Sequence, residues 1–180
     1  MLRPAYLHRE AVVRGFAQAM AQPHAQHYQL SSWSRWECKV YDSDWEEIQR
    51  ASTCGDRVLG LLAAHVDRDL PGVSEIGALA FLADGRHPSP VFSRDLATFL
   101  AELILARGFV RVAWSVTTLN PARLMYDKVV ERWGGRLVGE SRRSVRRPDG
   151  TYCGQRFYEV LPEDVPPRAL AEMCCLLRRT

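Results

Sequence analysis

Residues 114–139 read WSVTTLNPARLMYDKVVERWGGRLVG and contain the elements that decide the fold. The apolar run at 109–116 (FVRVAWSV) predicts a strand that leads into this stretch. Pro121 then predicts the first turn of a helix, where its missing N–H needs no partner. The glycine pair at 134–135 predicts the end of that helix, and residues 136–146 predict the next strand. The stretch therefore predicts a strand–helix–strand unit.

The flanking elements extend this unit into a sheet. Upstream, the apolar runs at 58–66 and 73–82 are short enough for buried strands, and residues 91–108 carry apolar side chains on one helical face. Downstream, a Pro-Asp-Gly turn predicts a hairpin between residues 136–146 and 152–161. The order β-β-α-β-α-β-β includes a strand–helix–strand crossover, which implies parallel strands. The predicted class is α/β (α+β), with a mixed sheet flanked by helices in three layers.

The two ends of the chain give weaker patterns. Residues 8–22 repeat apolar side chains at three- and four-residue steps, which predicts a helix. An aromatic-rich stretch follows, in which Asp44 either caps a short helix or belongs to an extended run. Residues 1–162 are predicted to form one domain. Residues 163–180 are predicted to form a C-terminal tail with a helix at 168–178.

The composition is that of an ordinary globular chain. Of the 180 residues, 47% are hydrophobic and 25% are charged, and the formal net charge is +3. No apolar run approaches the roughly 20 residues needed to span a bilayer, so no membrane partner is predicted. The five cysteines lack CxxC spacing, so neither a disulfide framework nor a metal site is predicted and a cytoplasmic location is expected.

The order of elements and four sequence features together resemble the GNAT acyltransferase superfamily. The features are Asn120 after a strand, Tyr126 and Lys128 on the following helix, the glycine stop, and Gly139 early in the next strand. The likeness covers residues 57–161. The pairing of FSRDL at a helix start with NPxxxxYDK is more narrowly similar to GNAT-like proteins encoded by bacteriophages, which would place the protein in a host cytoplasm.

The resemblance implies transfer of an acyl group, expected to be acetyl from acetyl-CoA, to a primary amine. In the family, backbone N–H groups between the central strand and the next helix bind the cofactor pyrophosphate. That segment here has no glycine between residues 85 and 108, and Asp95 lies in the predicted first turn. Asn120 is predicted to contact the cofactor, to cap its helix, or both. The predicted cofactor-binding residues are Leu79, Ala80, Phe81, Leu82, Arg86, His87, Ser93, Arg94 and Asn120.

Two residues are predicted to transfer protons. By the resemblance, Tyr126 lies near the cofactor sulfur and donates a proton to the leaving thiolate; the alternative is an aromatic residue that packs on the sheet. An alkyl amine has a pKa of about 10.4 and needs help to lose its proton. Glu75 is predicted to be that base, directly or through water; the alternative is a carboxylate that faces solvent. His65, on an apolar strand, is interpreted as a core histidine.

Arginines crowd the predicted hairpin in the sequence RRSVRRPDG. Arg142, Arg143, Arg146 and Arg147 are solvated strand residues, contacts to the cofactor 3′-phosphate, or contacts to nucleic-acid phosphates. With the phage likeness, the last alternative motivates a second hypothesis, an acetyltransferase that modifies an aminated base in DNA. The glycine-free segment motivates a third, a GNAT-fold binding protein without cofactor. The sequence leaves the formation of an oligomer open.

Overall fold

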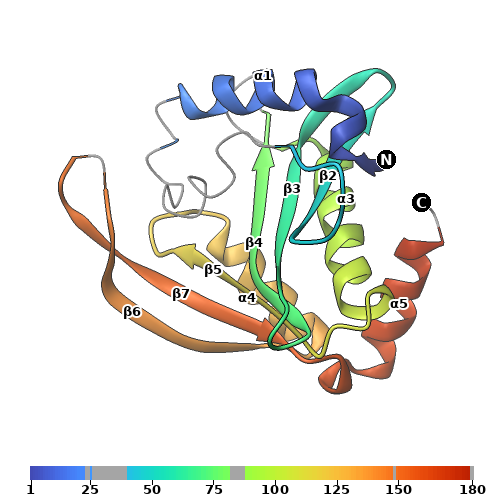
Figure 1. Ribbon diagram of the computed structural model, residues 1–180. Helices are drawn as coiled ribbons and strands as arrows, with labels where there is room; N and C mark the ends of the chain where they lie inside the picture. Colours follow the sequence, from blue (N-terminus) through green and yellow to red (C-terminus); the bar gives the residue numbers. More distant parts are fainter. Residues whose placement is uncertain (23–24, 26–39, 82–87, 148, 179–180) are drawn as a thin grey trace.

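The structure is a computed structural model that describes residues 1–22, 25, 40–81, 88–147 and 149–178 (Figure 1). Its strands are β1 (Leu2–Pro4), β2 (Glu47–Cys54), β3 (Arg57–Asp67), β4 (Gly72–Ala80), β5 (Arg111–Thr117), β6 (Arg136–Arg146) and β7 (Tyr152–Val160). Its α-helices are α1 (Arg9–Met20), α3 (Pro90–Ala101), α4 (Arg123–Trp133) and α5 (Pro167–Leu177). Short helical turns at Ala5–His8, Glu102–Ala106 and Pro162–Asp164 (η4) complete the described elements.

Within these residues the strands form one sheet in the order β1-β2-β3-β4-β5-β7-β6. The central pair, β4 and β5, is parallel and is joined through α3, and the other neighbours are antiparallel. A parallel pair needs such a crossover because a tight turn reverses the chain direction. The predicted mixed sheet is therefore confirmed.

Two cores lie on the two faces of the sheet, because successive side chains of a strand point to opposite faces. Leu62 and Ala64 of β3 belong to the larger core, with residues of α3, α4 and α5. Leu61 and Ala63 belong to the smaller core, with Phe16 and its neighbours on α1. In Figure 1, α1 lies across one end of the sheet, and α3 and α5 lie on its other side. The predicted three layers are confirmed.

The sequence pattern does not predict β1, and it leaves the β2 run open between a short helix and an extended segment. The extended alternative for the run after Asp44 is confirmed, since β2 begins at Glu47. Its polar residues Gln49 and Ser52 are buried, and the Ser52 hydroxyl donates to a carboxylate oxygen of Asp95 at 2.8 Å. Polar partners from other elements therefore join the buried apolar residues Ile48 and Ala51 in holding this strand inside the fold.

The predicted start of α4 at Pro121 is wrong by two residues, since the helix begins at Arg123. The side-chain Oδ1 of Asn120 accepts the backbone N–H of Ala122 at 2.9 Å, and this bond forms a turn before the helix. The end of the helix is as predicted, because Gly134 adopts a left-handed conformation with a φ of 78°.

The C-terminal segment forms α5 and packs on the body of the molecule. Ala169 and Met173 are buried in the same core as α3. On the exposed side of α5, Glu172 accepts a hydrogen bond from Arg132 of α4 at 2.8 Å. Residues 167–177 are therefore packed against the rest of the chain rather than extended away from it.

Candidate active site

The parallel strands β4 and β5 pair at one end and then separate. Their register contains two pairs, Gly72 with Arg111 and Val73 with Val112. Beyond Val73, β4 continues beside β3 as far as Ala80 but has no partner on β5. Figure 1 shows β4 and β5 diverging from their shared end. Among the described residues, no strand pairs with the β5 side of β4 beyond Val73, an arrangement that suits an extended ligand.

The predicted residues of β4 lie along this opening. Leu79 is buried in the α1 core, and the half-buried Ala80 packs against the core on the other face. The backbone N–H of Phe81 donates to the carbonyl of Leu59 on β3 at 2.8 Å, so it is engaged on the side away from β5. Leu82, Arg86 and His87 lie outside the described residues.

Tyr126 lies in an aromatic cluster next to β5. Its ring centroid is 5.7 Å from that of Trp114 on β5 and 6.1 Å from that of Tyr158 on β7. The side chain is 7% exposed. Burial, with a smaller contribution from Tyr158, raises the pKa of Tyr126 to about 12. The phenol therefore remains protonated, which is the form that a proton donor needs. The packing alternative for this residue also holds, since the ring fills part of the core.

Trp114 is a candidate that the sequence reasoning missed. Its indole is 2% exposed, and its Nε1–H has no hydrogen-bond partner within the described part of the chain. A buried donor without a partner is uncommon in folded proteins. The ring stacks on Tyr158 with 16° between the planes. The sequence places Trp114 on a strand, but the direction of the indole N–H depends on how the aromatic rings pack.

A polar network fixes Tyr158 behind this cluster. The Tyr158 hydroxyl donates to Oδ1 of Asp127 on α4 at 2.8 Å, and Nη1 of Arg156 donates to Oδ2 of the same carboxylate at 3.0 Å. Burial and the hydrogen bond to Asp127 raise the pKa of Tyr158 to about 12. Both tyrosines beside Trp114 are therefore neutral, and the ring stacked on it is anchored at its hydroxyl.

Asn120 lies between the end of β5 and the start of α4. The predicted N-cap role is wrong, because the N-cap of α4 is Ala122, without a side-chain cap; Oδ1 of Asn120 instead holds the turn that precedes the helix. The side chain is half-buried. The cofactor contact predicted for Asn120 remains a prediction.

The start of α3 presents polar groups beside the residues predicted to bind phosphate. Ser89 caps the helix by accepting the N–H of Phe92 at 3.1 Å. Ser93, in the first turn, and Arg94, directly after it, are exposed. Asp95 does not face outward as its position in the sequence suggests. Its carboxylate is buried and accepts from Ser52 and from the N-terminal ammonium of Met1, the latter at 2.9 Å. The acidic group that would repel phosphate is thus turned into the fold.

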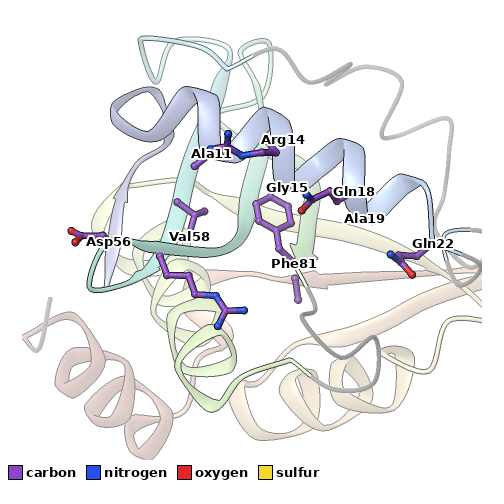
Figure 2. Close-up of a pocket in the computed structure, with 11 residues that line it drawn as sticks. Ala11, Arg14, Gly15, Gln18, Ala19, Gln22, Asp56, Val58 and Phe81 are labelled. Atoms are coloured by element: carbon purple, nitrogen blue, oxygen red, sulfur yellow. The ribbon is translucent and has the colours of Figure 1, made fainter.

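An open pocket of about 620 Å³ lies between α1 and the neighbouring ends of β3 and β4 (Figure 2). Ala80 and Phe81 form part of its wall, and the ring of Phe81 lies against Gly15 of α1. Arg14 and Arg57 line it with their cationic side chains. The pocket adjoins the last described residues of β4, where the cofactor-binding residues are predicted.

Glu75 lies half-buried on β4, on the face that α1 covers further along the strand. Its cross-strand partner on β3 is His65. Nδ1 of His65 is 2.7 Å from Oε1 of the buried Glu47 on β2. The structure therefore brings the predicted base next to a histidine that the sequence reasoning assigned to the core.

The arginines of the β6–β7 hairpin do not alternate regularly between faces. The register passes from Ser141 opposite Gln155 to Val145 opposite Cys153, so β6 has two additional residues in this bulge. Arg142 and Arg143 lie in the bulge and are exposed. Arg147 is held within the turn by Asp149 at 3.2 Å. The four arginines therefore have different surroundings rather than forming a uniform strip.

Two further findings concern the described residues only. None of their helices is long and apolar enough to cross a membrane. No three of their histidine, cysteine, aspartate and glutamate side chains form a group with the arrangement of a metal site.

Solved structures with a similar fold are acetyltransferases. RimJ from Mycobacterium smegmatis, in complex with CoA-disulfide, matches with a TM-score of 0.68 and 18% identity over 97% of this chain and 87% of that one. A mutant of spermidine N-acetyltransferase SpeG from Vibrio cholerae matches with a TM-score of 0.66 and 14% identity over 94% and 97%. A GCN5-related N-acetyltransferase from Brucella melitensis matches with a TM-score of 0.61 and 19% identity over 97% and 81%.

These likenesses establish the fold. The chain has the mixed sheet and flanking helices of the GNAT N-acetyltransferases. Comparison with protein-family models gives no match, and comparison with curated protein sequences gives none either.

Proposed function

We propose that this chain is an acyl-CoA-dependent N-acyltransferase that transfers an acetyl group to a primary amine. The observation that carries the proposal is the opening between β4 and β5, with the buried phenol of Tyr126 packed on the strand that borders it. Proteins of the same fold include N-acetyltransferases, and one of them is in complex with CoA-disulfide.

The residues around the opening fit coenzyme A. Beyond Val73 the β5 side of β4 has no strand partner, which suits an extended chain with amide groups. The buried N–H of Trp114 is a donor without a described partner. The inward turn of Asp95 leaves Ser93 and Arg94 as the outward polar groups at the start of α3, where anions are favoured. When bound, acetyl-CoA supplies an acyl group activated as a thioester.

Each proposed catalytic group has one task. Glu75 takes a proton from the acceptor amine, since a protonated amine has no lone pair for attack. A backbone N–H near Leu79 to Leu82, other than that of Phe81, which bonds to Leu59, stabilises the developing negative charge on the acyl oxygen. Tyr126 donates its proton to the departing sulfur. Burial raises the pKa of this phenol to about 12, so the proton that it donates is in place at the start of the reaction.

Titration calorimetry with acetyl-CoA tests the cofactor part of the proposal. We expect saturable heat and a rise in melting temperature at about millimolar cofactor, because a ligand that binds only the folded state stabilises it. Desulfo-CoA serves as the control for binding without thioester chemistry. Absence of both heat and thermal shift would contradict the proposal and favour the GNAT-fold binding protein without cofactor.

An aminated base in DNA is the second candidate acceptor. The observation in its favour is the exposed pair Arg142 and Arg143, which the β6 bulge presents to solvent. The bacteriophage likeness behind this candidate stays a prediction. Incubation with acetyl-CoA and DNA that carries aminomethylated pyrimidine, followed by nucleoside mass spectrometry, tests it. We expect an acetyl mass increase that Arg142→Ala with Arg143→Ala reduces. Absence of that increase with the unaltered chain rules this acceptor out.

A further inference from the structure

Three titratable side chains form a row across neighbouring strands. Glu47 on β2 is the register partner of His65 on β3, and His65 is the register partner of Glu75 on β4. Directly opposed residues lie on the same face of a sheet, with Cβ atoms about 5 Å apart. The row ends at β4 beside the first unpaired part of the opening, because β4 and β5 stop pairing at Val73.

The contact between Glu47 and His65 fixes the state of the imidazole ring. Oε1 of Glu47 is 2.7 Å from Nδ1 of His65, and the carboxylate side chain is 6% exposed. An ionised carboxylate is only an acceptor, so Nδ1 carries the hydrogen and donates it. In the neutral ring Nε2 then carries the lone pair. The ring is therefore oriented as a base with Nε2 as its basic atom.

The orientation also decides which strand the basic atom faces. Nδ1 is bonded to Glu47 on β2, so Nε2 is the ring nitrogen left for the other neighbouring strand, β4, on which Glu75 is the register partner of His65. Within the described part of the chain, Nε2 makes no hydrogen bond. The side chain is 35% exposed. A histidine with a purely structural role in a core is usually more enclosed and has both nitrogens engaged.

We propose that Glu47, His65 and Glu75 form a proton relay, in which Nε2 of His65 accepts the proton that Glu75 takes from the acceptor amine. This inference rests on the proposed N-acyltransferase function. An imidazole is more basic than a carboxylate by about two pKa units in model compounds, so the proton moves to the better base. The buried carboxylate of Glu47 stabilises the imidazolium that forms. Glu47 is thus a positioning residue, and His65 holds the proton.

The protons and bonds balance in this scheme. One proton of the acceptor ammonium passes to Glu75, then to Nε2 of His65 and from there to solvent, which leaves the neutral amine. The amine nitrogen forms a bond to the acyl carbon, its second proton follows the same route, and the bond from that carbon to sulfur breaks. The departing sulfur takes the phenolic proton of Tyr126, and the phenolate regains a proton from solvent. The products are an amide and a free thiol, with every side chain restored.

The test uses the full chain with acetyl-CoA as donor and, as acceptor probes, spermidine, lysine amide and a peptide with a free N-terminus. We expect His65→Ala to lower kcat about 100-fold, the size of a lost general base, without a matching change in the Kd of acetyl-CoA. Added imidazoles restore part of the rate, and the restored rate rises with the basicity of the imidazole. A residue that only fills space would show no such dependence on basicity.

Two further variants complete the design. Glu47→Gln keeps an oxygen acceptor for Nδ1 but removes the charge, and we expect kcat to fall about 10-fold. Glu46→Gln is the matched control, because its side chain is 63% exposed and lies 3.8 Å from Arg68, outside the row. We expect Glu46→Gln to retain the kcat of the unaltered chain.

The outcomes separate the inference from the function on which it rests. Turnover by His65→Ala at the unaltered rate, or a loss that no imidazole restores in a folded variant, overturns the relay and leaves the proposed function standing. If His65→Ala does not fold, an unchanged kcat in Glu47→Gln overturns the relay instead. An unaltered chain that binds acetyl-CoA and acetylates none of the three acceptors overturns both.

Discussion

At the scale of single residues, the burial of Tyr126 serves both packing and chemistry. The ring fills a core position between Trp114 and Tyr158, and the same loss of water raises the pKa of its phenol to about 12. The property that a proton donor needs therefore follows from packing and requires no charged partner. Burial has a different consequence for Trp114. It leaves the indole Nε1–H next to this phenol without a hydrogen-bond partner among the described residues.

Removal of the Tyr126 hydroxyl tests its role. Tyr126→Phe keeps the ring and the aromatic packing, so we expect the melting temperature to change little. If the phenol donates a proton, kcat falls by about 100-fold while the Kd of acetyl-CoA stays nearly constant. Steady-state kinetics with calorimetry measures both. The matched control Tyr152→Phe alters an exposed tyrosine on β7. Equal kcat in the two variants would show that Tyr126 is only a packing residue.

The pH dependence of kcat tests the same phenol. Burial raises its pKa to about 12, above the ordinary value of a phenol, so the donor form persists above pH 10. We expect kcat to stay level up to about pH 11, whereas an ordinary phenol would lose half of its protons near pH 10. The raised phenol pKa stabilises the folded state below about pH 10, and this stabilisation is lost towards pH 12. Circular dichroism at each pH therefore checks that the protein is still folded. A fall in kcat centred on pH 10 in folded protein contradicts the assignment.

At the scale of elements, the site is assembled from the ends of β4, β5, α3 and α4. The ends of these elements depend on local bonds: Asn120 turns the chain before α4, Ser89 caps α3, and Gly134 ends α4. Since α4 carries Tyr126, the bonds at its two ends set where the phenol lies relative to β5. A small change at an element end therefore has consequences at the site.

Arg94 tests the start of α3 as an anion site. The side chain is exposed just after the first turn of the helix, near the positive end of the helix dipole, and lies 3.7 Å from the carboxylate of Asp95. We expect Arg94→Ala to weaken acetyl-CoA about 5-fold, which corresponds to about 1 kcal/mol. Arg132→Ala is the control, as this arginine lies on α4 in an ion pair with Glu172. Calorimetry at two salt concentrations measures the effect, and equal affinities in the two variants argue against a phosphate contact at Arg94.

Gly134 tests how strictly the end of α4 is defined. It has a φ of 78°, and a Cβ there would overlap the carbonyl oxygen of Asp164. Gly55 has a φ of 58° with open space around it. We expect Gly55→Ala to cost about 1 kcal/mol from the left-handed conformation alone, and Gly134→Ala to cost distinctly more. Urea denaturation compares the two free energies of unfolding. Equal losses would mean that the segment with Asp164 moves aside freely.

At the scale of the whole molecule, the sheet consists of two parts that meet over a short distance. Strands β1 to β4 form one part and β5 to β7 the other, with two residue pairs between β4 and β5. The helices α3 and α5 contact each other on one face, and the large core spans both parts of the sheet. The opening for a ligand can persist because the core beneath it, rather than the strand pairing, holds the two parts together.

Met173 tests whether α5 belongs to that core. Its side chain is fully buried, so Met173→Ala removes apolar contacts and leaves a cavity. We expect a loss of about 3 kcal/mol in the free energy of unfolding. Leu170→Ala, on the exposed side of the same helix, is the control and should cost far less. If urea denaturation gives equal losses for both variants, α5 does not contribute to the main core.

The sequence by itself determined the order of the central elements. Apolar runs predicted β3, β4 and β5, and glycine and proline signals predicted the end of α4 and the hairpin, because these signals act over a few neighbouring residues. It left β2 open and did not predict β1 or the inward turn of Asp95, because these features depend on polar partners far away in the chain.

Only the tertiary structure decided which side chains and strands lie next to one another. It placed Tyr126 against Trp114, separated β4 from β5, and aligned Glu47, His65 and Glu75 across three strands. Strand register and ring packing arise from contacts between residues that are distant in the chain. A sequence specifies those contacts only through the fold as a whole, and for that reason the histidine beside the predicted base looked like an ordinary core residue until the strands were paired.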